Sequence, residues 1–410
     1  MGISTDKAFR QRLIFFTIIL MLAGLFVSRA LLSISMILFL LLTCVHAQFL
    51  QQLKKFRKQP FLIGLTLLFF LPFLTWFWSE DKETWWRFTR IKLPLLLLPI
   101  AFAGEWQLRR RTWNYVAYTF ILLVLAGCAW SLFQYAGNYQ DMQEAYLKAK
   151  VIPTPFENDH VRFSLSVTIA ILCASFLMKA GQYKWLLATI ILVFVIYLHL
   201  LAARTGLISF YIALFIAFIY LLFTRNKTKW TIAVLAGALL MPLLAWFAVP
   251  TFQNRIRYFI YDYSYIRQDT YLPGANDGNR MLSIRAGLDI MNHHALGVGT
   301  GDVMKATNNW YDRKVHGMLE TDRIYPSSEW AMHGAAAGWP GFIVFTIAMI
   351  LPFFALNRRG GYFWVSLNAI MAFSFIFDIG LEVQFGVFLY AFAVLWWWKW
   401  LQEEELKKAS

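Results

Sequence analysis

Arg204 is the residue whose position most directly suggests chemistry. It stands in Ala203-Arg204-Thr205-Gly206, at the junction between two long apolar runs. A guanidinium at the edge of the hydrocarbon layer is costly unless it reaches the interface or pairs with an anion. Its planar fork donates two parallel hydrogen bonds, which suits phosphate and carboxylate groups. The position therefore indicates either a snorkelling side chain or an anion-binding arginine that faces an interior cavity.

A second patch lies in the longest polar stretch of the chain. It begins with helical spacing, in which Arg280 and Arg285 stand among apolar residues, and continues into the turn Gly297-Val-Gly299-Thr-Gly301. Because no strand precedes this turn, the glycines do not predict a dinucleotide site. The end of a helix followed by a tight turn is the simpler interpretation of the glycines.

A third patch, Ser327-Ser-Glu329-Trp-Ala-Met-His333, leads directly into another apolar run. Histidine and carboxylate side chains are the usual general bases, whereas a serine hydroxyl is a poor base near neutral pH. A lone histidine or glutamate is also commonly structural, so the spacing alone does not establish a catalytic role.

The composition predicts that these patches are carried by membrane-spanning helices. The chain has 410 residues, 59% hydrophobic and 15% charged, whereas soluble domains are nearer ~45–50% apolar and ~25% charged. This balance excludes a soluble multidomain enzyme, a disordered protein and a nucleic-acid binder. Since a span needs roughly 20 apolar residues, we expect an all-α polytopic integral membrane protein with about twelve transmembrane helices. The expected spans are 13–27, 30–50, 61–78, 93–104, 115–135, 161–180, 185–203, 206–223, 230–250, 337–356, 362–377 and 383–400.

The charges between the spans predict their orientation. Each internal cluster of Lys and Arg follows an even-numbered span, as the positive-inside rule requires, so both termini are expected in the cytoplasm. A run of tryptophans near the C-terminal end is typical of an interfacial aromatic belt. The clusters are Lys54, Lys55, Arg57 and Lys58; Arg109, Arg110 and Arg111; Lys179 and Lys184; Arg225, Lys227 and Lys229; Arg358 and Arg359; the tryptophans are Trp396, Trp397, Trp398 and Trp400.

The same orientation divides the chain into three expected parts. Residues 1–250 hold the first nine spans, residues 251–336 form a large loop on the outer side, and residues 337–410 hold the last three spans and a cytoplasmic tail. The acidic and basic residues of the loop balance. A loop of this length in a compact fold is usually functional.

The three patches together resemble the O-antigen ligase and polymerase superfamily of bacterial envelope glycosyltransferases. In that superfamily an S/A-R-T/S-G-type motif opens a span. A periplasmic loop then carries an Arg-containing helix and a glycine-rich turn, and H-[NSQ]-x9-G-x2-G enters the next span. Here residues 203–206 match the first motif, Arg280 with His294-Ala-Leu-Gly297-Val-Gly299 is similar to the second, and residues 327–341 keep the spacing of the third. The resemblance covers most of the chain.

The resemblance implies a GT-C-like glycosyltransferase of the bacterial inner membrane. Such an enzyme transfers a polysaccharide from undecaprenyl diphosphate to an acceptor at the periplasmic face, and the resemblance implies no metal and no other cofactor. The ligase-like pattern favours an O-antigen ligase, whose acceptor is lipid A–core. The alternative is an O-antigen or exopolysaccharide polymerase, which uses the same donor and a growing glycan as acceptor.

The resemblance also implies site residues. It implies diphosphate contacts from Arg204 and Arg280, with Arg285 as a lesser candidate. The family's catalytic histidine falls on Ser327, so the expected catalytic group is Ser327, Glu329 and His333, of which a neighbour of the serine would supply the base.

Two other functions fit parts of the sequence. A metal-dependent lipid-phosphate-sugar transferase would use acidic residues in an outer loop, for which Glu80-Asp81-Lys-Glu83 is available. A lipid or glycan transporter or flippase would carry ionisable residues within its spans. The charges here cluster at the span ends instead, so the sequence favours an enzyme.

Overall fold

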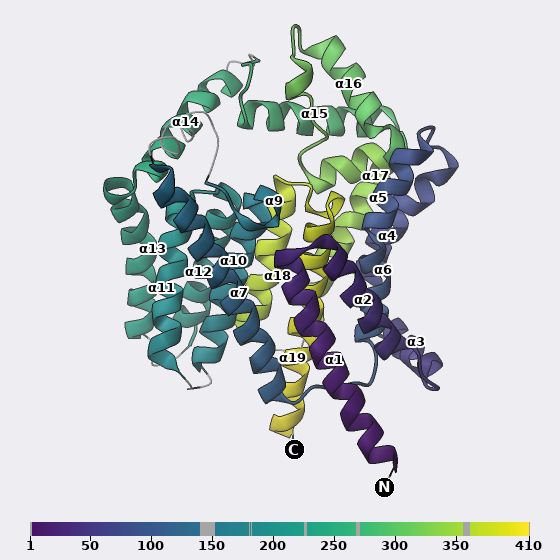
Figure 1. Ribbon diagram of the computed structural model, residues 1–410. Coiled ribbons are helices and arrows are strands. Elements are labelled where there is room, and N and C mark those ends of the chain that lie inside the picture. The colour runs from purple at the N-terminus through teal and green to yellow at the C-terminus, as the bar shows by residue number, and fades with distance from the viewer. Residues whose placement is uncertain are drawn as a thin grey trace.

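The computed structural model describes residues 2–139, 152–179, 181, 183–224, 228–267, 271–355 and 361–409. Over these residues the regular elements are all helices, as the apolar runs predict (Figure 1). The α-helices are α1 Gly2–Val27, α2 Arg29–Cys44, α3 Phe49–Arg57, α4 Pro60–Leu74, α5 Lys82–Ile91, α6 Leu93–Phe102, α7 Arg110–Gly137, α9 Pro155–Asn158, α10 His160–Lys179, α11 Lys184–Leu201, α12 Arg204–Leu222, α13 Thr228–Ala248, α14 Pro250–Arg267, α15 Asp277–His293, α16 Val303–Lys314, α17 Glu329–Ile350, α18 Gly361–Ile376 and α19 Gln384–Ala409. Short 3₁₀ turns are η1 Thr75–Phe77, η2 Thr300–Asp302, η3 Glu320–Asp322, η4 Leu351–Phe354 and η5 Gly380–Glu382.

The helices account for all twelve expected spans, but not every one has the length and composition of a full span. Among the described residues, eight helical segments are long and apolar enough to cross a membrane, or nine if α2 and α3, bent by 101° at their junction, form one span. The other three expected spans hold α6, α18 and α19. The protein is therefore a polytopic membrane protein, and the count of twelve crossings stays a prediction. The eight segments are Ala8–Val27, Pro60–Phe77, Arg110–Gly137, His160–Lys179, Lys184–Leu201, Arg204–Leu222, Thr228–Ala248 and Glu329–Phe354.

The tryptophan run of α19 is part of the protein core. The expected interfacial belt is wrong, because Trp396, Trp397 and Trp400 are at most 1% exposed. Trp397 and Trp400 lie against Phe176 of α10, with ring centroids 5.5 and 4.6 Å away. Bulky rings bury large areas and interlock edge to face, so α19 and α10 form the centre of the bundle.

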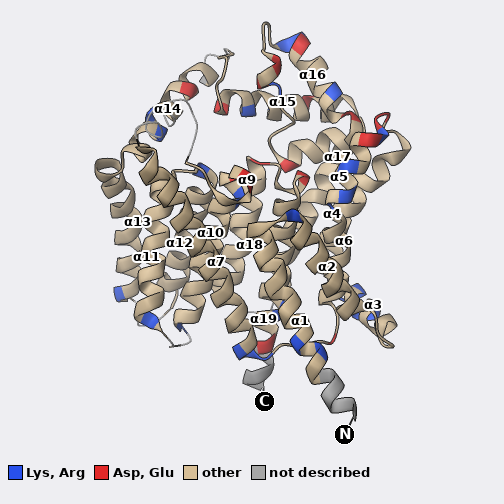
Figure 2. Cartoon of the chain, in the orientation of Figure 1, with Lys and Arg blue, Asp and Glu red and all other residues tan. Residues whose placement is uncertain are grey.

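The two ends of the molecule differ in charge and in structure. Both termini lie at one end, while α14, α15 and α16 cover the opposite end (Figure 1). Most acidic residues lie at the covered end, whereas Lys and Arg lie at both ends and have few acidic residues beside them near the termini (Figure 2). The expected basic residues Arg225, Lys227, Arg358 and Arg359 lie outside the described residues.

α15 connects the covering helices to the bundle. It packs against both α14 and α17, and its apolar side is buried at Ala286, Ile290 and Met291. Ala286 and Ile290 are four residues apart, the spacing that places side chains on neighbouring turns of one helix face. The packing fixes how the polar residues of α15 lie relative to the ends of the spans.

Candidate active site

The first turn of α15 brings together residues that lie far apart in the sequence. Arg204, at the start of α12, pairs with Asp277, the first residue of α15. Asp277 and Gly278 donate their backbone amides to the carboxylate of Asp262 in α14, at 2.7 and 3.1 Å. This network joins α12, α14 and α15, so Arg204 lies beside the helix that carries Arg280.

Arg280 lies one turn further along α15, and its guanidinium is held at two atoms. Its Nε donates to Oδ1 of Asn276 at 3.1 Å, and its Nη1 donates to the carbonyl oxygen of Phe377 at 3.0 Å. A guanidinium carries five N–H donors. The two contacts therefore orient the side chain and use only part of its capacity to bind an anion.

More cations lie at the start of α10. Arg162 pairs with Asp378 at 2.7 Å. The positive charges of three arginines act on the imidazole of His160: Arg162, Arg255 and Arg280. These neighbours of Arg280 were not predicted from the sequence, because a cation at the end of an apolar run is ordinary. The available signal was His160-Val-Arg162 at the start of a span on the expected outer side.

Asp378 links the two groups of arginines. It lies between α18 and α19 and is buried, with 8% of its surface exposed. Burial raises the pKa of its carboxyl group, while the positive charges of Arg162 and Arg280 act in the opposite direction. Asp378 thus pairs with Arg162, and its charge also acts on Arg280.

Ser327 contacts α15 at Ser283, which lies one turn after Arg280. Its backbone N donates to Oγ of Ser283 at 3.0 Å, and the Ser283 hydroxyl donates to the carbonyl oxygen of Arg280 at 2.7 Å. Among the described residues, the Ser327 hydroxyl makes one long contact, 3.4 Å, to the carbonyl oxygen of Tyr325. The structure thus brings Ser327, Arg280 and Arg204 to the same end of one helix.

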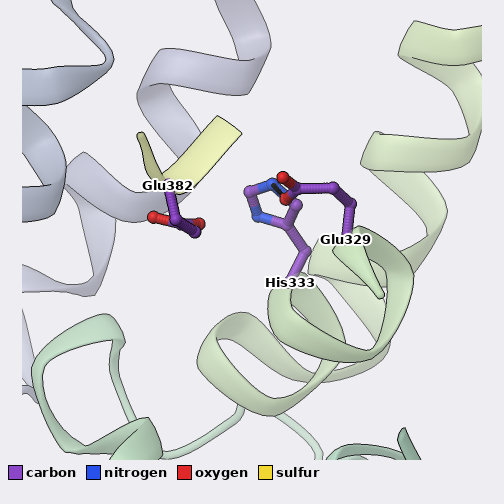
Figure 3. A group of neighbouring side chains, drawn as sticks. All are labelled: Glu329, His333 and Glu382. Carbon is purple, nitrogen blue, oxygen red and sulfur yellow. Dashed lines mark ion pairs between the residues drawn. The ribbon is translucent and has the colours of Figure 1, made fainter. Parts of the chain in front are cut away.

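The other two expected catalytic residues lie in a separate buried cluster. Glu329 and His333 come from the first turns of α17, and Glu382 comes from η5 (Figure 3). The exposed fractions are 0%, 3% and 5%, respectively. Oε2 of Glu329 lies 3.5 Å from Nε2 of His333, and Oε1 of Glu382 pairs with Nζ of buried Lys92 at 2.5 Å. Sequence reasoning missed Lys92 and Glu382, which no local spacing connects to Glu329.

Arg285 faces a different side of α15 from Arg280. Five residues correspond to about 140° around a helix that has 3.6 residues per turn. Its side chain is exposed and lines a small pocket together with Asp262 and Tyr265. The structure therefore does not bring Arg285 to the face on which Arg280 lies.

The glycine-rich turn serves to dock α15 against α17. The amides of Val298 and Gly299 donate to the carbonyl oxygens of Ala335 and Ala336, both at 2.9 Å. A Cβ at Gly297 would lie only 2.4 Å from the carbonyl group of Ala336, and this glycine has a φ of +72°. The glycines are thus needed for close backbone contact and a left-handed turn.

Residues 187–346 match the family model described as O-antigen ligase. No curated protein matches the chain. The matched segment holds Arg204, Arg280 and Ser327, which the fold brings to one end of α15. The match supports a relation to the O-antigen ligase-related superfamily and, together with the apolar helices, a membrane enzyme with glycosyltransferase-like activity on a lipid-linked glycan and an acceptor.

Proposed function

We propose that this O-antigen ligase-related protein transfers a glycan from undecaprenyl diphosphate to lipid A–core at the periplasmic face of the bacterial inner membrane. A growing glycan would be the acceptor in the alternative, polymerisation. The observation that carries the proposal is the meeting of Arg204 and Arg280 at the start of α15. Helix α15 lies at the end of the molecule opposite both termini (Figure 1). The basic clusters near the termini favour a cytoplasmic location for the termini, which leaves α15 on the periplasmic side.

The arginines supply what the transfer step requires. An acceptor hydroxyl attacks the anomeric carbon, the bond from that carbon to the diphosphate oxygen breaks, and the bonding electrons leave with the lipid diphosphate. Guanidinium groups placed at this oxygen stabilise the developing charge, and each such donor contributes about 10²–10³ in rate. Because Arg204 and Arg280 supply positive charge at the diphosphate, we expect no metal ion to be needed there.

We propose His160 as the base that takes the acceptor proton. A base must come within hydrogen-bond reach of the proton it removes. Glu329 and His333 are enclosed by protein, with Oε1 of Glu329 already accepting from the amide of Leu381 at 2.5 Å. The imidazole of His160 is partly exposed and lies near Arg280. Ser327, in this proposal, fixes the loop beside the arginines and does not take the proton.

The test combines a deletion strain with the purified protein. In the deletion strain, a rough core with accumulated lipid-linked polymer identifies a ligase, and a core that carries a single repeat unit identifies a polymerase. With the purified protein and a synthetic lipid-diphosphate glycan, Arg204→Ala, Arg280→Ala and His160→Gln are expected to lose most transfer. Arg313→Ala, a change in an exposed arginine of α16, is the control. Unchanged lipopolysaccharide together with active Arg204→Ala protein would contradict the proposal.

A further inference from the structure

Glu329, His333 and Glu382 leave three buried ligand atoms unsatisfied. Oε2 of Glu329, Nε2 of His333 and Oε2 of Glu382 have no hydrogen-bond partner among the described residues. Buried polar atoms are normally paired, so three orphans that face one another require an explanation. We propose that these residues bind a divalent transition metal, of which Zn²⁺ fits the ligand set best, in a structural site separate from the diphosphate.

The spacing of the three residues suits a small metal ion. Glu329 and His333 stand four residues apart on α17, which puts both side chains on one helix face, and Glu382 approaches from η5 (Figure 3). Ligand atoms of the three residues lie within 4.8 Å of one another, and the Glu329–His333 pair is 3.5 Å apart. Tetrahedral Zn²⁺ holds N and O ligands at about 2.0–2.2 Å, so two ligands are about 3.3–3.6 Å from each other. A contraction of up to about 1.3 Å at Glu382, with a water molecule as the fourth ligand, would complete that geometry.

Each ligand is already oriented by a neighbour. The amide of Leu381 holds the other carboxylate oxygen of Glu329 at 2.5 Å, and Lys92 holds the other oxygen of Glu382 at 2.5 Å. The ring of His333 stacks on Phe345, with centroids 4.9 Å apart. Partners of this kind fix the direction of metal ligands and strengthen binding.

The charges of the cluster also favour a cation. With both glutamates ionised, Lys92 pairs with Glu382, and the buried carboxylate of Glu329 is paired with no Lys or Arg among the described residues. A proton or a water molecule is the simpler occupant and is what the test must exclude. The imidazole ligand distinguishes the site from a Mg²⁺ or Ca²⁺ site, since those ions prefer oxygen ligands only.

A metal here would tie the start of α17 to the segment between α18 and α19. That segment also carries Phe377 and Asp378, which hold Arg280 and Arg162. The inference does not rest on the proposed function, because metal content is measured on the purified protein without any glycan.

The experiment is elemental analysis of the full-length protein, purified in detergent on a tag without histidines. Wild-type protein is expected to contain stoichiometric zinc, or to acquire it from ZnSO₄ and retain it after desalting. His333→Gln and Glu329→Gln each leave the Lys92–Glu382 pair in place and are expected to lower the retained zinc at least about tenfold. His316→Gln and Glu320→Gln remove the same residue types from exposed positions and are the matched controls.

Two results would overturn the metal site. One is wild-type protein that retains no more zinc than the buffer blank, before or after incubation; the other is His333→Gln protein that retains as much as wild type. If the variants do not fold, chelator-treated wild-type protein is titrated with Co²⁺, whose visible absorption bands report four-coordinate binding. Absence of those bands would show that the cluster holds water or a proton instead.

Discussion

Arg280→Lys tests whether the geometry of the guanidinium matters as well as its charge. The lysine keeps the positive charge but loses the planar fork that Asn276 and Phe377 orient. A hydrogen bond to a charged group contributes about 1.5–3 kcal/mol, and a tenfold rate change corresponds to about 1.4 kcal/mol. Losing one such bond to the leaving diphosphate therefore predicts a decrease in kcat of roughly tenfold to 150-fold. Arg280→Ala, which removes the charge too, is expected to lose about 10²–10³.

Asn276→Ala makes the same test more specific. Asn276 touches Arg280 at Nε and is proposed to act only by orienting it, so this variant is expected to lose less activity than Arg280→Lys. In an Arg280→Ala background, Asn276→Ala should have no further effect on kcat, because the group that it orients is gone. A double-mutant cycle measures this coupling directly.

The assay is initial-rate transfer from a synthetic lipid-diphosphate glycan by protein reconstituted in nanodiscs, with Arg313→Lys as the control. Circular dichroism and gel filtration establish that each variant is folded. The reasoning is refuted if Arg280→Lys has wild-type kcat, since then only the charge would count. It is also refuted if the losses from Asn276→Ala and Arg280→Ala simply add, since Asn276 would then act independently of Arg280.

Two further predictions concern the scaffold. Gly297→Ala is expected to lower Tm more than Gly274→Ala. Both glycines have a φ of +72°, but only Gly297 has backbone within 2.4 Å of the added Cβ, and such overpacking costs about 1–3 kcal/mol. Equal losses of Tm in the two variants would contradict the docking role. Burial acts to raise the pKa of Asp322, but hydrogen bonds from Tyr271 and Gly274 outweigh it and leave this pKa below its usual value. The stabilisation of the fold by ionised Asp322 is therefore complete above the unfolded pKa of about 3.9 and is lost as the pH falls through the lower folded pKa. The Tm difference between wild type and Asp322→Asn should accordingly shrink below about pH 4. A difference that grows with acid would show the opposite sign.

The sequence predicted the helical membrane fold and two of the arginines at the candidate site, because both depend on local signals. A long apolar run predicts a helix wherever it stands, and Arg204 is conspicuous because a cation between two spans is costly. Apolar content did not predict whether a face contacts lipid or protein. The tryptophans of α19 pack inside the bundle, and a belt and a core look alike in the sequence.

The buried cluster could not be predicted, because its members come from separate segments. Glu329 and His333 have a helical spacing that is visible in the sequence, but Lys92 and Glu382 join them only through the packing of η5 and the end of α5 against α17. His160 was missed for a related reason, since the charges around it come from α10, α14 and α15. Such long-range contacts require the tertiary structure.

Two arginines at the candidate site, Arg204 and Arg162, are each paired with an acid, and this pairing has a consequence for donor binding. Arg204 contacts Asp277, and Arg162 contacts Asp378, so neither guanidinium is exposed to the hydrocarbon edge without a counter-charge. A diphosphate that binds Arg204 must compete with Asp277, which lowers donor affinity but keeps the arginine in place between turnovers. Asp277→Asn should therefore tighten donor binding and weaken the fold, as measured by KM and Tm on the same preparation. An Asp277→Asn variant with a higher KM and an unchanged Tm would show that Asp277 contacts the substrate instead of positioning Arg204.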